Sequence, residues 1–147
     1  MNNERVFIEK KEDFNVEAKL LKEDLKTYLG IEGLEDVRII NVYDLIGGSS
    51  KDKEELISKI LYEKQVDDLF YDIDIRDNER YFRLKDVDGQ FNQREDSINE
   101  MIRFALGKED FYVSHSRLFI FTGLDEKDFA RVKKYFINPV ELEEIDL

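Results

Sequence analysis

The chain of 147 residues contains no cysteine, one histidine and one proline. Without cysteine it has no disulfide framework, no thiolate zinc site, no iron–sulfur cluster and no cysteine nucleophile. Because His115 is the single histidine, a histidine-rich metal site is excluded as well. No apolar run approaches the roughly 20 residues of a membrane span, and the first residues lack the apolar stretch of a signal peptide. We therefore expect a cytoplasmic protein.

Positive charge is scarce: the chain has 35 acidic and 23 basic side chains, and its formal net charge is −12. Such a charge repels nucleic acids and anionic membranes, so neither is an expected partner. Hydrophobic residues make up 41% of the chain and aromatic residues 12%. That supply is sufficient for a packed core, so we expect a folded chain of one domain or two small ones.

Periodic apolar residues divide the chain into short strands and amphipathic helices. Gly30 and Gly107 occupy the cap positions that follow two of the helices. A third helix is expected to begin at Asp52, with Glu55 as its capping-box partner. The expected strands cover residues 5–11, 37–46, 69–75, 81–87, 111–121 and 140–147, and the other expected helices cover 16–29, 94–106 and 125–136.

The two halves of the chain share the order strand, helix, long strand, helix, strand. The cap glycines Gly30 and Gly107 are 77 positions apart (107 − 30), and Asp52 and Asp125, which begin helices, are 73 apart (125 − 52). We interpret this agreement as an internal duplication of about 75 residues, with halves 1–78 and 79–147. The fold class that follows is α+β: in each half two helices cover one face of an antiparallel sheet, and the halves form one pseudo-symmetric domain.

Two polar segments have ordinary structural explanations. Gly-Gly-Ser-Ser-Lys at 47–51 lies between a strand and a helix but lacks the spacing of a phosphate-binding loop, which favours a turn with a helix cap. Asp72 and Asp74 share one strand face and could hold a hard cation, but no calcium-loop pattern surrounds them. A solvated strand face explains them better.

Two features of the long strand in the second half of the chain also have structural rather than functional interpretations. His115 has no second histidine and no oxyanion-hole signature near it, so we expect a surface or edge residue. The aromatic segment 117–123 is similar to the base-stacking strand of RNA-recognition domains. The acidic charge of the protein disfavours RNA binding. Because Phe119 and Phe121 lie on one face of the strand, we expect them in the core instead.

The segment 88–97 resists such an explanation because it is rich in amides and has an aromatic residue at its middle. Asn92 as N-cap, with Glu95 three residues later, accounts for two positions. Gln90, Phe91 and Arg94 have no role in turn chemistry.

Residues 89–97 read Gly-Gln-Phe-Asn-Gln-Arg-Glu-Asp-Ser. This stretch resembles the Gly-Gln-Phe-Asp-Gln-Arg-x-Asp-Ser motif in the N-terminal domain of the large, single-chain phosphoribosylformylglycinamidine synthases of purine biosynthesis. Asn92 replaces the acid, which removes a carboxylate but keeps hydrogen bonding and capping. The similarity extends over most of the chain in the same order, through residues 7–11, 16–18, 37–41, 43–44 and 137–141.

The resemblance implies a function for the complete enzyme, an ATP-dependent ligase and glutamine amidotransferase. That enzyme converts formylglycinamide ribonucleotide to the amidine with ammonia released from glutamine. Its N-terminal domain looks like two fused copies of the small PurS subunit, arranged as in the PurS dimer. The site for ATP and Mg²⁺ belongs to a later synthetase domain, and the cysteine nucleophile belongs to a glutaminase domain. This chain is then expected to be a PurS-like fragment without cofactor or catalytic residue.

The resemblance also suggests which residues act. Gln90, Phe91, Gln93 and Arg94 are expected to form a domain interface with the synthetase and glutaminase parts, and no metal ligands are expected. The competing interpretation is a free-standing ferredoxin-like module with a regulatory or small-metabolite-binding role. An independent enzyme ranks third because no paired catalytic constellation is visible.

Overall fold

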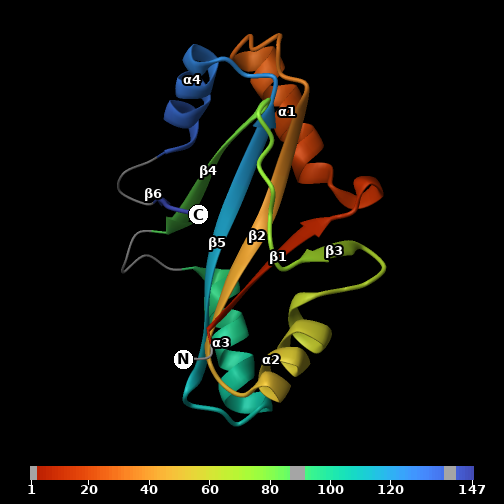
Figure 1. Ribbon diagram of the computed structural model, residues 1–147, viewed down its shortest axis with the longest axis vertical. Helices are drawn as coiled ribbons and strands as arrows, with labels where there is room; N and C mark the ends of the chain where they lie inside the picture. Colours follow the sequence, from red (N-terminus) through yellow and green to blue (C-terminus); the bar gives the residue numbers. More distant parts are fainter. Residues whose placement is uncertain (1–2, 87–91, 138–141) are drawn as a thin grey trace.

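The computed structural model describes residues 3–86, 92–137 and 142–147, and these form an α+β fold with an antiparallel sheet (Figure 1). Six strands and four α-helices lie in the described part. The strands are β1 (Glu4–Lys10), β2 (Asp36–Gly47), β3 (Asp67–Phe70), β4 (Glu79–Asp86), β5 (Phe111–Thr122) and β6 (Leu142–Ile145). The helices are α1 (Val16–Tyr28), α2 (Ser50–Leu56), α3 (Gln93–Ala105) and α4 (Glu126–Phe136), with a 3-10 turn η1 (Glu12–Phe14) before α1 and a π-helical turn η2 (Ile57–Leu61) after α2.

The strand order is β3-β1-β2-β5-β4-β6, and every neighbouring pair is antiparallel. The long strands β2 and β5 pair along their whole length, from Asp36 opposite Thr122 to Gly47 opposite Phe111. The boundary between β2 and β5 therefore divides the sheet into two halves. One half contains β1, β2 and β3, and the other contains β4, β5 and β6.

The helices form two groups at opposite ends of the long axis, α1 with α4 and α2 with α3 (Figure 1). Each group covers its own apolar cluster on the same face of β2 and β5, because side chains of one face recur at every second residue of a strand. Leu25 and Val132 join Val37 and Phe121 under α1 and α4. Under α2 and α3, Leu56, Ile98 and Ile102 join Tyr43, Leu45 and Val113.

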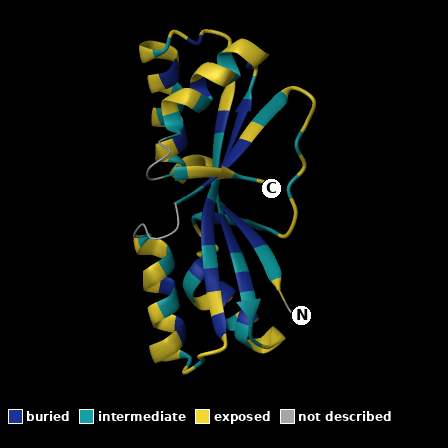
Figure 2. Ribbon diagram, turned by 90° about the vertical axis from the view of Figure 1, so that its left-hand side faces the viewer, coloured by how far each residue is buried: buried dark blue, intermediate teal, exposed yellow. Residues whose placement is uncertain are grey.

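The other sheet face is covered by extended chain. The segment 71–78 crosses it, and Figure 2 shows this segment on the side away from α1 and α4. Ile73 and Ile75 pack there on a cluster that includes Ile40 and Leu118. Both faces of the central strands are consequently buried, as the run of buried residues near the end of β5 indicates.

The predicted strands and helices can be compared with the structure one by one. The strand expected over 69–75 ends at Phe70, because extended chain lying across an apolar face produces the same alternation as a paired strand. Asp72 and Asp74 are exposed, as expected, but they lie outside any strand. Where the structure describes them, the boundaries of the other predicted elements agree with it to within a few residues; residues 87, 140 and 141 of the predicted strands lie outside the described residues.

The cap of α2 differs from the expectation. Ser49, not Asp52, is the N-cap: its Oγ accepts from the Asp52 backbone N–H at 3.1 Å, and Asp52 Oδ2 accepts from the Ser49 N–H at 3.1 Å. Glu55 instead forms an ion pair with Lys59. The predicted cap glycines Gly30 and Gly107 have φ of 66° and 65°, a left-handed conformation that ends helices with little strain in glycine.

Candidate functional site: a polar cleft between the helix groups

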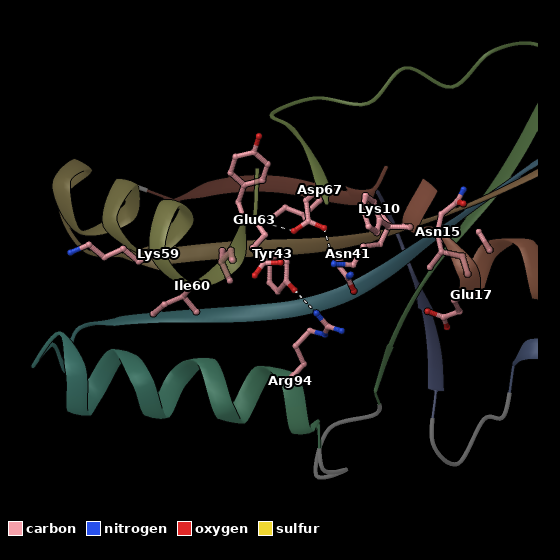
Figure 3. A pocket seen from close by; sticks show the side chains of 16 residues that line it. Lys10, Asn15, Glu17, Asn41, Tyr43, Lys59, Ile60, Glu63, Asp67 and Arg94 are labelled. Atoms are coloured by element: carbon pink, nitrogen blue, oxygen red, sulfur yellow. Dashed lines mark hydrogen bonds and ion pairs between the residues drawn. The ribbon is translucent and has the colours of Figure 1, made fainter. Parts of the chain in front are cut away.

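A cleft of about 440 Å³ lies on the helix-covered face of the sheet, between α1 and the end of α2. We call it the central cleft, and Figure 3 shows the side chains that line it. Its main polar side chains are Lys10, Asn15, Asn41, Tyr43, Asp67 and Arg94.

Four of these side chains come from β2 or from the beginning of a helix, and these positions direct them to the cleft. Asn41 and Tyr43 are alternate residues of β2 and therefore share the helix-covered face. Asn15 is the residue before α1, and Arg94 lies in the first turn of α3. Segments from both halves of the chain thus meet at the centre of the sheet, where neither helix group covers it.

Lys10 and Asp67 form a self-contained ion pair at one wall. Lys10 Nζ lies 2.9 Å from Asp67 Oδ1, and Asp67 Oδ2 accepts from the Glu63 backbone N–H at 3.0 Å. Asp67 is only 4% exposed. Because both of its oxygens have partners, this carboxylate has a structural role and closes the turn that leads into β3.

Arg94 reaches from α3 to Tyr43, and its Nη1 donates to the Tyr43 hydroxyl at 3.1 Å (Figure 3). Tyr43 is 2% exposed; burial raises the pKa of its hydroxyl, and the charge of Arg94 opposes this effect. Within residues 3–86, 92–137 and 142–147, no carboxylate lies within ion-pair distance of Arg94. The guanidinium therefore brings a positive charge to the cleft.

Asn15 contributes a buried acceptor without a donor. Its Oδ1 is buried and has no hydrogen-bond partner among the described residues, and its side chain does not cap α1. An unpaired buried polar group costs about 1–3 kcal/mol. Such groups are uncommon in folded proteins and call for a specific explanation.

His115 does not line the cleft; it is buried beside Asn41 and Tyr43, only 5% exposed, so the expected surface or edge position is wrong. It lies on β5, a central strand, and its ring is 5.1 Å from that of Tyr43. Nε2 donates to Asn41 Oδ1 at 2.8 Å, while Nδ1 faces Asn92 Nδ2 at 3.4 Å and accepts from it. These two partners select the Nε2–H tautomer.

The charge state of His115 follows from its surroundings. Burial, followed by the positive charges of Arg94, Arg117 and Lys85, lowers its pKa from 6.5 to about 3. The imidazole is therefore neutral at physiological pH and acts as a rigid hydrogen-bonding link between β5, β2 and the start of α3. It is poorly suited to general acid–base catalysis near neutrality.

Two of the four residues expected at the domain interface lie within the described part of the chain. Gln93 and Arg94 begin α3 and are both exposed, whereas Gln90 and Phe91 lie outside the described residues. Asn92 is the N-cap, as expected: its Oδ1 accepts from the Glu95 N–H at 2.9 Å.

The role of Asn41 was not among the predictions from sequence. A polar residue interrupts the apolar alternation of β2 between Ile39 and Tyr43, and this break in the pattern is the signal that marks the cleft. No comparable signal identified Asn15 or Lys10, since their contribution depends on contacts distant in sequence.

A second polar cluster lies on the opposite face of the same strands, and we call it the arginine cluster. Arg83 donates to Ser116 Oγ at 2.7 Å, to Asp44 Oδ2 at 2.9 Å and to the main-chain oxygen of Asp146 at 2.6 Å. Arg5 Nε donates to Asp44 Oδ1 at 2.6 Å. Burial, and then the charge of Arg5, lower the pKa of Arg83, while Asp44 opposes this.

The remaining predictions about chemistry concern membranes, RNA and metals. Within the part of the chain that the structure describes, no helix has the length and apolarity to cross a membrane. Phe119 and Phe121 are buried in the apolar cluster under α1 and α4, as expected, and are inaccessible to nucleic-acid bases. Across the described ranges, no three His, Cys, Asp or Glu side chains are grouped so that they could hold a metal ion.

Comparison with known proteins yields no relative. No family model, no curated protein and no solved structure matches this chain.

Proposed function

We propose that this chain is the N-terminal coupling domain of a phosphoribosylformylglycinamidine synthase. In this role it joins the synthetase and glutaminase domains, supports the transfer of ammonia between them and carries no catalytic residue of its own. The observation that carries the proposal is the position of the 89–97 motif. Its described part begins α3 at the middle of the molecule and presents Gln93 and Arg94 at the surface.

The strand order supports a duplicated, PurS-like architecture. From one edge the sheet reads β3-β1-β2, and from the other edge it reads β6-β4-β5. These are the third, first and second strands of each proposed half, in the same order. The antiparallel pairing of β2 with β5 is compatible with a two-fold relation near Val42 and Ser116, which lie opposite one another. The helix groups follow the same scheme, because each group contains one helix from each half.

The proposed interface consists of Gln90, Phe91, Gln93 and Arg94. Arginine suits an interface because its planar guanidinium bonds a carboxylate or phosphate through two N–H groups at once. Capping by Asn92 and the bond from Asn92 to His115 hold the start of α3 in place, so the motif is presented from a rigid base.

Reconstitution tests this proposal. The chain is added to a polypeptide that contains the synthetase and glutaminase domains of the same organism's enzyme but lacks the N-terminal domain. We expect a stable complex and recovery of glutamine-dependent amidine formation. If a folded chain neither binds that polypeptide nor restores its activity, the proposal is wrong. A large thermal shift of the isolated chain with ATP would also contradict it, because the ATP site is assigned elsewhere.

The alternative is a free-standing regulatory or small-metabolite-binding module. The central cleft favours it, since a well-formed cleft with convergent polar groups is a common feature of ligand sites. Failure to associate with the synthetase, together with saturable binding of a metabolite by the chain alone, would favour this alternative.

A further inference from the structure

We infer that the outer face of α3 is a docking surface for the synthetase–glutaminase polypeptide, which meets it with an apolar pocket for Phe104 and a carboxylate for Arg94. This inference rests on the proposed coupling function and extends the proposed interface from the motif along the whole helix. The described residues of this outer face are Gln93, Arg94, Met101 and Phe104.

Exposed apolar side chains follow the motif along α3. Met101 is 45% exposed and Phe104 is 81% exposed, while Ile98 and Ile102 of the same helix face the core. Because successive residues of an α-helix are about 100° apart, Phe104 lies about 160° around the helix from Ile102 and about 20° from Gln93. A partner that contacts the start of α3 on its outer face therefore also meets Phe104.

The fold does not require apolar residues at these positions. In the proposed duplication α1 is the counterpart of α3: both helices have 13 residues and follow an asparagine. Counted from the helix start, Asp24 and Thr27 are the residues of α1 that correspond to Met101 and Phe104. Polar residues serve at the same places on α1, so the exposed methionine and phenylalanine of α3 call for a function outside the folded chain.

A matched pair of contacts shows where positive charge is left over. Tyr43 of β2 and Arg117 of β5 each lie one residue beyond the proposed two-fold point. Glu17 and Arg94 are each the second residue of their helix. Arg117 forms an ion pair with Glu17, whereas Arg94 has the neutral Tyr43 hydroxyl as its partner among the described residues. The arginine at the start of α3 is thus complemented by a carboxylate from outside the chain.

The side-chain types and the net charge favour a different protein over a second copy. Aromatic residues, methionine and arginine are enriched at the cores of protein interfaces, where an aromatic anchor fills an apolar pocket. Two copies of this chain, each with a net charge of −12, repel one another. A partner surface that combines an apolar pocket with a carboxylate complements Phe104 and Arg94 together.

Isothermal titration of the chain into the synthetase–glutaminase polypeptide tests the inference. Phe104→Ala is expected to weaken binding at least about tenfold, Arg94→Gln about tenfold and Met101→Ala about threefold. The matched control is Tyr28→Ala, because Tyr28 is 77% exposed on α1, and this variant should bind as the parent does. Since these side chains are exposed, the thermal unfolding midpoint of each variant should stay within about 2 °C of the parent's.

Failure of this inference is distinguishable from failure of the proposed function. If the parent binds and restores glutamine-dependent activity but Phe104→Ala binds as tightly, the inference is wrong and the coupling function stands. Equal weakening by Tyr28→Ala and Phe104→Ala would also overturn it, because the loss would not be specific to α3. If the parent ignores the polypeptide and forms a dimer that Phe104→Ala dissociates, a second copy is the occupant and both proposals are wrong.

Discussion

Two polar regions lie on opposite faces of the sheet at β2, and they differ in how well their polar groups are satisfied by hydrogen bonds. In the arginine cluster, Arg83 has an acceptor for each of its three nitrogens. In the central cleft, Asn15 Oδ1 has no partner and Arg94 has no counter-ion among the described residues. A satisfied buried network stabilises one conformation, whereas an exposed guanidinium such as that of Arg94 has N–H donors left for a ligand or partner. Residues in the first region should therefore govern stability, and residues in the second should govern binding.

The largest effect is expected in the arginine cluster. Arg83→Ala leaves the Ser116 hydroxyl and the Asp146 main-chain oxygen without their donor and Asp44 with one arginine fewer. We expect a loss of about 3 kcal/mol in the free energy of unfolding, measured by urea denaturation. Arg103→Ala, on the exposed surface of α3, should change it by less than about 0.5 kcal/mol. Similar values for the two variants would contradict the comparison.

The second prediction concerns pH and His115. Its pKa is about 3 in the folded chain and about 6.5 in the unfolded chain, so below pH 6.5 the unfolded state binds a proton that the folded state does not. Stability should thus fall as the pH is lowered from 6.5 to 4.5, with a contribution from His115 of about 2 kcal/mol. The measurement is the difference between the parent and His115→Gln at the two pH values, which cancels the carboxylates common to both. An identical pH dependence of the two proteins would refute it.

The third prediction applies to the complete enzyme. Alanine at both Phe91 and Arg94 should lower glutamine-dependent amidine formation about tenfold, because a charge-assisted contact of Arg94 is worth about 1.5–3 kcal/mol. Ammonia-dependent formation should remain, since the synthetase chemistry lies elsewhere. Arg103→Ala serves as the control. If both activities of the double variant equal those of the parent, the motif has no role in coupling.

A fourth, smaller effect is expected at Asn92. Asn92→Ala removes the cap bond to the Glu95 N–H and the contact with His115 Nδ1. We expect a loss of about 1 kcal/mol in the free energy of unfolding. Asn92→Asp restores an acceptor for the cap but not a neutral donor for His115, so an intermediate stability is expected. A stability of Asn92→Ala that equals the parent's would show that the capping seen here contributes nothing.

The smallest effect has the opposite sign. Asn15→Ala removes a buried oxygen that has no partner among the described residues, so the unfolding free energy should stay the same or rise by up to about 1 kcal/mol. Thermal unfolding of the ligand-free chain gives the measurement. A clear loss of stability would mean that Asn15 supports the fold, and the contrast between the two regions would not hold.

Much of the fold was predictable because it depends on local patterns. Alternation identified β2 and β5, helical spacing identified α1, α3 and α4, and Asn92 was recognisable as a cap from its spacing to Glu95. The site was less accessible. Arg94 was singled out from its motif, whereas Asn15 and Lys10 had no distinguishing pattern because their partners come from other parts of the chain.

His115 shows the same distinction most clearly. Nothing in its neighbouring residues distinguishes an edge strand from a central one, so its burial depends on the pairing of β5 with both β2 and β4.

By itself, the amino-acid sequence determined the α+β class, the order of strands and helices, and the exclusion of thiol chemistry. These properties depend on composition and on periodicities of two and 3.6 residues, which are local. Only the tertiary structure decided that both faces of β2 and β5 are buried, that one face carries a satisfied arginine cluster and that the other carries a cleft. Those properties arise from contacts between residues far apart in sequence, such as Arg94 with Tyr43 and Arg83 with Asp44.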